Sequence, residues 1–156
     1  MKRLFPFLAA TLALAACSPS VPVKAVLVDG RVTFTGADPD GRRVPCPGSL
    51  AILAENGAPV WRIDQDGRHE GPGCAFRFPV TYGQPPAGFT ASAAAASLEP
   101  GRLYVIAGDG GLYGAFSLRG SGAGAAIDNV DAGSARAQEI RRRYQAQGVT
   151  APVRPG

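Results

Sequence analysis

Histidine is almost absent from the chain: His69 is the only one in 156 residues. Zinc and copper sites use several histidine, cysteine or carboxylate ligands held close together, which one histidine and widely spaced cysteines do not supply. A Ser-His-Asp triad would have to recruit His69 from the turn-rich segment DGRHEGPG, and the sequence has no G-x-S-x-G elbow. The sequence therefore argues against a histidine-based metal site and against a serine hydrolase of this type.

Long apolar runs are also missing. The run from Leu4 to Ala16 is shorter than the roughly 20 residues that a transmembrane helix needs. It follows the basic residues Lys2 and Arg3 and ends at Cys17, a layout typical of an export signal peptide. We therefore expect residues 1–16 to be a signal peptide.

The end of this segment, Leu14-Ala15-Ala16-Cys17, resembles the lipobox of bacterial lipoproteins. In that family the cysteine thiol receives a diacylglyceryl group before cleavage, and three acyl chains hold the mature protein stably at a membrane. The resemblance implies lipidation of Cys17, and Ser18 implies sorting to the periplasmic face of the outer membrane. The alternative is an ordinary secretory signal cleaved near Ala16, with Cys17 left as a free thiol.

Cysteine is scarce, since Cys17, Cys46 and Cys74 are the only three. Lipidation of Cys17 leaves an even pair, and disulfides persist in the oxidising compartment that an exported protein meets. We therefore expect a Cys46–Cys74 disulfide. In the chain-entropy view, closing a loop of roughly 29 residues stabilises a fold by about 3.5 kcal/mol.

Glycine and proline are abundant, with 21 and 14 copies. This balance favours short strands joined by turns over long helices, and the length without the signal segment suits one domain. Residues 24–35 predict strand that is turned or bulged at Asp29-Gly30. Two further segments predict hairpins: 49–64 with a two-residue turn at Asn56-Gly57, and 102–118 turning at 108–111. Apolar residues alternate through 74–82, which predicts one more strand with a core face.

This pattern predicts a mainly β protein, either an antiparallel sandwich or a small barrel. The stretch Leu98–Ile106, LEPGRLYVI, resembles the L-x-P-x-x-x-Y-x-V motif of fibronectin type III domains. In that family the tyrosine corner ties the phenol, here of Tyr104, to nearby backbone, with Leu98 and Pro100 as the other motif positions. The resemblance implies a fibronectin type III or immunoglobulin-like β-sandwich with Trp61 as its buried tryptophan.

Residues 134–147 predict a C-terminal α-helix, with Ser134 as its N-cap and Gly148 as its stop. One face of this helix is apolar and carries Ala137, Ile140 and Tyr144. Residues 134–156 hold five arginines and one glutamate, so this tail is basic. A basic tail suits contact with anionic lipid or another polyanion, and a solvated helix face is the alternative.

Other motif fragments are incomplete. The segments 64–67 and 38–41 resemble the opening of calcium loops, but neither continues to the distal glutamate of an EF-hand, so acidic turns are predicted. Residues 120–125 contain G-x-G-x-x-A without a following helix pattern, which predicts a linker rather than a dinucleotide site. We assign no catalytic, metal or cofactor-binding residue and expect no nucleic-acid partner.

The sequence thus predicts a signal peptide (1–16), a tether (17–22), a β-sandwich domain (23–133) and a basic helix and tail (134–156). The predicted function is that of a lipid-anchored cell-envelope lipoprotein, a non-enzymatic structural or protein-interaction module with a cell-envelope partner. A periplasmic ligand-binding or enzyme-inhibitor domain is the alternative, and an enzyme is a third class.

The disulfide prediction is tested on the exported protein. Peptide mapping without reductant is expected to recover the peptides that contain Cys46 and Cys74 as one linked species, because lipidation of Cys17 removes the third thiol. Two thiols that react freely with an alkylating reagent would contradict it.

Overall fold

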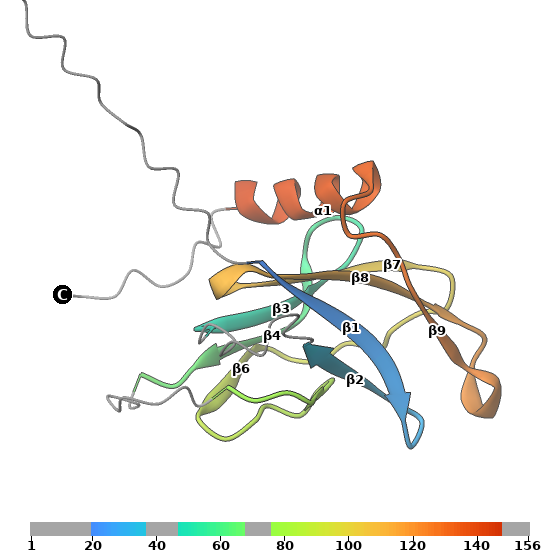
Figure 1. Cartoon of the computed structure of the whole chain (residues 1–156), viewed down its shortest axis with the longest axis horizontal. Coiled ribbons are helices and arrows are strands. Elements are labelled where there is room, and N and C mark those ends of the chain that lie inside the picture. The colour runs from blue at the N-terminus through green and yellow to red at the C-terminus, as the bar shows by residue number, and fades with distance from the viewer. Residues whose placement is uncertain (1–19, 37–46, 68–75, 148–156) are drawn as a thin grey trace, which may run out of the picture.

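The computed structural model describes residues 20–36, 47–67 and 76–147 (Figure 1). Several residues singled out above lie outside these ranges: Cys17, Cys46, Cys74, His69 and the segment 38–41. The strands are β1 (Val21–Val28), β2 (Arg31–Gly36), β3 (Ser49–Leu53), β4 (Pro59–Gln65), β5 (Val80–Thr81), β6 (Phe89–Ala93), β7 (Leu103–Gly108), β8 (Leu112–Arg119) and β9 (Ala126–Asn129). The helix α1 (Ala135–Ala146) follows, and the 3₁₀ turns η1 (Asp109–Gly111) and η2 (Gly122–Gly124) flank β8.

In the described part of the chain these strands form one strongly curled sheet, which we call the half-barrel (Figure 1). Its order is β5-β2-β1-β8-β7-β3-β4-β6, with β9 also paired to β8. All pairs are antiparallel except β1 with β8, which are parallel over two residue pairs, Val21 with Leu112 and Pro22 with Tyr113. The mainly β class and the C-terminal helix are confirmed, whereas a two-sheet sandwich is not.

Two hairpins show how local residues set the turns. Asp29 and Gly30 both have positive φ, 50° and 73°, which makes the expected turn or bulge a tight two-residue turn between β1 and β2. The two-residue turn expected at Asn56-Gly57 is wrong. Gly57 alone is left-handed (φ 83°), and Asn56 instead uses its Oδ1 to accept a hydrogen bond from the Ala58 N–H at 3.0 Å. The loop between β3 and β4 is therefore longer, and Ala54 N–H donates across it to the Ala58 carbonyl.

The strand expected over residues 74–82 is limited to β5 among the described residues. Pro79 has no N–H for a ladder, so regular pairing with β2 begins only at Val80. The expected core face is present nevertheless. Phe76 and Val80 are buried, and Phe78 and Tyr82 pack against the same cluster.

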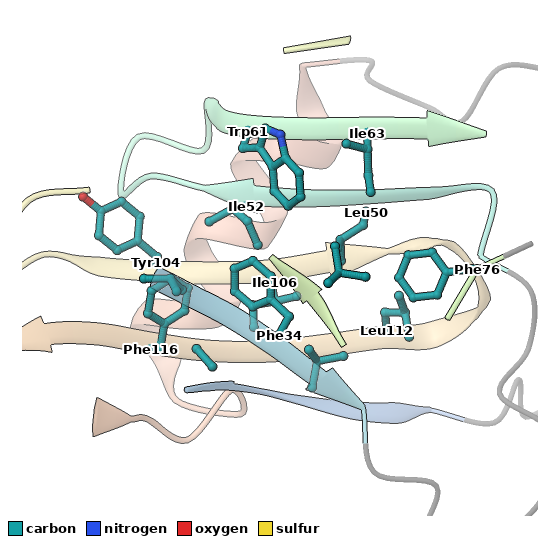
Figure 2. Packing of buried hydrophobic residues seen from close by; sticks show 14 of the residues in the cluster. Phe34, Leu50, Ile52, Trp61, Ile63, Phe76, Tyr104, Ile106, Leu112 and Phe116 are labelled. Carbon is teal, nitrogen blue, oxygen red and sulfur yellow. The ribbon is translucent and has the colours of Figure 1, made fainter. Parts of the chain in front are cut away.

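The concave side of the half-barrel holds the main core (Figure 2). Phe34 of β2 lies at its centre and is fully buried. Its ring centroid is 6.3 Å from that of Trp61, 5.8 Å from that of Phe116 and 6.5 Å from that of Tyr82. The hydroxyl of Tyr82 lies 2.7 Å from the Ala96 carbonyl oxygen and 3.1 Å from that of Val60, so Tyr82 links the β5 side of the half-barrel to β4.

The convex side carries a second core under α1. Alternation along the strands sends Leu103 and Val105 of β7 to this side and Tyr104 and Ile106 to the concave side. Because the convex side is covered by Ala137 and Ile140 of α1, every residue of β3 is buried. The helix begins as expected, with the Ser134 Oγ accepting a hydrogen bond from the Ala137 N–H at 3.4 Å. These contacts fix α1 across β3 and β7 (Figure 1).

The first strand begins inside the segment that the sequence predicts to be a tether. Residues 17–22 are expected to be a free linker, but β1 already begins at Val21. Val21 is buried in the main core, and both Val21 and Pro22 pair with β8. The linker expected after Cys17 is therefore at most residues 18–20.

A side-chain amide holds β1 where it leaves β8. Gly114 lies in β8, and a Cβ there would overlap the Val23 carbonyl oxygen, so glycine permits this close approach. Beyond this point β1 no longer pairs with β8, and the side chain of Asn129, in β9, hydrogen-bonds to the β1 backbone instead. Its Oδ1 accepts from the Ala25 N–H and its Nδ2 donates to the Ala25 carbonyl, both at 2.8 Å.

Tyr104 occupies the position that the fibronectin resemblance gives to its tyrosine. Its ring is buried and stacks on Phe116 with centroids 5.5 Å apart, and its hydroxyl accepts a hydrogen bond from the Glu99 N–H at 2.7 Å. Leu98 packs against the main core, while Pro100 is exposed. This local contact lies within a single curled sheet.

Replacing Tyr104 tests this contact. Tyr104→Phe removes only the hydroxyl and is expected to lower the free energy of unfolding by about 0.5 to 1.5 kcal/mol. Tyr104→Ala also removes the ring, and the loss is expected to reach roughly 3 to 5 kcal/mol. Denaturant unfolding measures both values. A wild-type midpoint in both variants would contradict the buried placement.

Candidate functional site

A cleft of about 430 Å³ lies between the C-terminal half of α1 and one end of the half-barrel. We call it the α1 cleft. It is lined by Ser20, Ser49, Arg62, Ala107, Gly108, Asp109, Gly111, Leu112, Tyr113, Arg141, Tyr144 and Gln145. Five separate parts of the chain therefore meet here: the residue before β1, the sheet-end residues of β3 and β4, the β7–η1–β8 turn, and the helix.

The spacing on α1 explains why Arg141 and Tyr144 reach the cleft. Each follows a buried residue by four positions, Arg141 after Ala137 and Tyr144 after Ile140. Residues four apart share one face of a helix. The same apolar anchors that fix α1 to the sheet therefore place these two polar side chains beside the end of the half-barrel.

Helix docking also depends on the turn between β3 and β4. A Cβ at Gly57 would come within 2.6 Å of the Arg143 Cβ and 2.9 Å of the Tyr144 nitrogen. Glycine therefore serves two purposes at this position, the positive φ of the turn and the close approach of the helix. The Arg143 Nη1 adds a hydrogen bond to the Glu55 carbonyl at 3.2 Å.

Arg62 forms the wall of the cleft on β4 and is held on both sides. Its Nη2 donates to the Asp64 Oδ1 at 2.7 Å, and its Nη1 donates to the Tyr144 hydroxyl at 3.0 Å. Burial is the largest single effect and lowers the pKa of Arg62, but the Asp64 hydrogen bonds together with the charges of Asp64, Tyr144 and Asp109 raise this pKa above its ordinary value. The Asp64 carboxylate also accepts a hydrogen bond from Ser92. Asp64, which the sequence places in an acidic turn, therefore belongs to a structural network on β4.

Asp109 lies at the opposite end of the network, in η1. Its Oδ2 accepts a hydrogen bond from the Ser49 hydroxyl at 2.9 Å, and its charge acts on Arg62 to raise the pKa of that side chain. In the described ranges no cation lies within ion-pair distance of Asp109. Two carboxylates, those of Asp64 and Asp109, therefore act on the single positive charge of Arg62. Arg141, on the helix side of the cleft, pairs with no carboxylate of the described residues.

Arg141 is the cation on the helix side of the cleft. Its Nη2 is buried and has no hydrogen-bond partner among the described residues. Burial lowers the pKa of Arg141, and no carboxylate of these residues pairs with it to offset this effect. The other arginines of α1 differ: Arg136 pairs with Glu55 at 2.6 Å, and both Arg142 and Arg143 pair with Glu139. Within the described residues, Arg141 is therefore the helix arginine that lacks a counterion.

Of the residues singled out from the sequence, Tyr144 lines this cleft, where it bonds to Arg62 instead of serving only the apolar face of the helix, and the tyrosine-corner residues lie elsewhere. Tyr104 and Trp61 face the concave core, on the opposite side of the sheet from α1. Sequence reasoning missed Arg62, Asp109 and Arg141. Arg62 carries a visible signal, a charge between the apolar residues Trp61 and Ile63, but Arg141 is one of three consecutive arginines and cannot be told apart by pattern.

Neither known proteins nor other kinds of site assign a function to this cleft. No family model matches the chain, and no curated protein or solved structure matches it. Among the residues that the structure describes, no group of three or more histidine, cysteine or acidic side chains is placed to hold a metal ion. The same residues include no helix that is both long and apolar enough to span a membrane.

The Arg62–Tyr144 contact can be tested by removing one hydroxyl. Tyr144→Phe leaves one N–H of a buried guanidinium without its acceptor, so the free energy of unfolding is expected to fall by about 0.5 to 1.5 kcal/mol. Tyr113→Phe is the matched control, because Tyr113 lines the same cleft and no described residue hydrogen-bonds its hydroxyl. Equal midpoints for the two variants in denaturant would contradict a stabilising contact.

Proposed function

We propose that this chain is a lipid-anchored cell-envelope lipoprotein whose half-barrel is a non-enzymatic interaction module at the periplasmic face of the outer membrane. The observation that carries the proposal is the start of β1 at Val21. The lipobox-like segment ends at Cys17, so residues 18–20 separate the proposed lipid from a buried strand. Three residues span at most about 10 Å, which would hold the folded domain close against the membrane surface.

The non-enzymatic role is supported by how the polar groups near the cleft are used. Arg62 donates hydrogen bonds to both Asp64 and Tyr144, and Ser49 donates to Asp109. Catalytic groups instead direct a base or nucleophile at a reacting atom. Relationship to the fibronectin type III or immunoglobulin-like sandwiches is also a proposal, supported by the Tyr104–Glu99 hydrogen bond and not by the single curled sheet.

The alternative function, ligand binding, is favoured by one specific observation. The α1 cleft has the size of a small-ligand site, about 430 Å³, and one of its charges lacks a partner. A structural module has no need for such a cavity. Ligand binding and membrane anchoring are compatible, so the two functions can belong to the same protein.

Lipidation is tested by Cys17→Ser. Wild-type protein is expected in the membrane fraction with the mass of an acylated chain that begins at Cys17, and the variant is expected to lose both properties. Cys46→Ser is the control for loss of a cysteine, because it leaves the lipobox intact; since it also opens the expected disulfide, only its mass and its membrane partition are compared. Unchanged mass and membrane partition in the Cys17 variant would contradict the anchor.

A further inference from the structure

We infer that the α1 cleft binds a phosphate group through Arg141, the phosphate belonging either to a membrane phospholipid headgroup or to a soluble phosphate. This inference deepens the ligand-binding form of the proposed function and rests on it. The inference that the phosphate belongs to a membrane phospholipid rests in addition on the proposed lipid anchor.

The first reason is the unmet hydrogen-bonding capacity of Arg141. A guanidinium carries five N–H donors in a planar fork that matches the oxygens of phosphate. A buried donor without an acceptor is unfavourable, most of all when it is charged. Since Arg141 lines the cleft and pairs with no carboxylate of the described residues, an anion in the cleft would supply the counterion that this part of the chain does not provide.

The second reason is the set of neutral donors beside Arg141. The residues that line the cleft also include Tyr113, which carries a hydroxyl, and Gln145, which carries an amide. Neither has a hydrogen bond from the parts of the chain that the structure describes. Phosphate presents several acceptor oxygens, so one guanidinium with two neutral donors is a suitable set of ligands.

The negative charge of Asp109 repels an anion in the same cleft and therefore restricts where a phosphate can bind. Its carboxylate is engaged by Ser49 and acts on Arg62, on the sheet side of the cleft. Repulsion from Asp109 favours a phosphate held on the helix side, at Arg141. Removing this charge is expected to tighten phosphate binding, in the opposite direction to removal of Arg141.

The third reason is position. Ser20 lines the cleft and follows the proposed lipid attachment residue by three positions. Three residues span at most about 10 Å, so an anchored protein would hold the cleft within reach of the headgroup layer. A phospholipid phosphate is then the anion nearest to Arg141.

The test uses the full chain in an uncharged detergent, titrated with inorganic phosphate by isothermal titration calorimetry. Arg141→Gln is expected to weaken phosphate binding about tenfold or more. Arg142→Gln is the matched control, since it removes the same charge one position along α1, from a side chain that is paired with Glu139 and is not part of the cleft lining. This control is expected to change the dissociation constant less than twofold. Asp109→Asn is expected to lower it.

The source is tested in detergent micelles that contain phosphatidylglycerol or, as the phosphate-free comparison, diacylglycerol. A response to phosphatidylglycerol alone that is lost in Arg141→Gln supports the lipid headgroup. A response to inorganic phosphate with the same dependence supports a soluble ligand. Failure of the wild-type chain to respond to either phosphate would overturn the inference, as would equal losses in the Arg141 and Arg142 variants.

Failure of this inference can be told apart from failure of the anchor. The mass of the native protein reports lipidation and does not depend on the cleft. A lipidated chain that binds neither phosphate overturns the cleft assignment alone. An unlipidated chain that binds inorganic phosphate through Arg141 supports the cleft and overturns the membrane source. Should Arg141→Gln fail to fold, tighter binding by Asp109→Asn supports the site and unchanged or weaker binding overturns it.

Discussion

Phe34 packs where the curled sheet comes closest to closing on itself, and the rest of the fold depends on this contact. It enters the core from β2 and meets Phe116 of β8, which is separated from β2 by β1 alone, and Trp61 of β4, which lies toward the other end of the strand order. A sheet of this size can bury its concave face only by curling around large side chains. Complete burial of a phenylalanine is worth about 1.5 to 3 kcal/mol, and here it also seals the faces of its aromatic neighbours.

The curl explains why the polar cleft lies on the outside. Because the concave side is filled with aromatic and aliphatic side chains, the charged residues Arg62 and Asp64, which alternate with the core residues Trp61 and Ile63, point to the convex side. The helix then covers part of that side through two small apolar anchors. Where these anchors end, the polar side chains of helix and sheet meet and leave the cleft between them.

Sequence reasoning succeeded where a feature depends on neighbours along the chain. The Asp29-Gly30 turn and the helix cap at Ser134 follow from backbone preferences of single residues. It failed where the feature depends on distant pairs. The close approach of α1 to Gly57 brings together residues far apart in the chain, and the cleft requires Arg62 and Tyr144, which lie 82 positions apart. Hydrophobic alternation indicates strands but does not determine whether they form two sheets or one curled sheet.

The bond between Ala25 and Asn129 sets the order in which the molecule can fold. Its partners are 104 residues apart, and the strand that contains Ala25 is made first. At synthesis rates of about 5 to 20 residues per second, roughly 5 to 20 seconds pass before Asn129 exists. Until β8 and then β9 have been made, the second edge of the β1–β2 hairpin has no partner, so the native sheet cannot close early. For the exported chain proposed above, this delay keeps the sheet open until its later strands have been made.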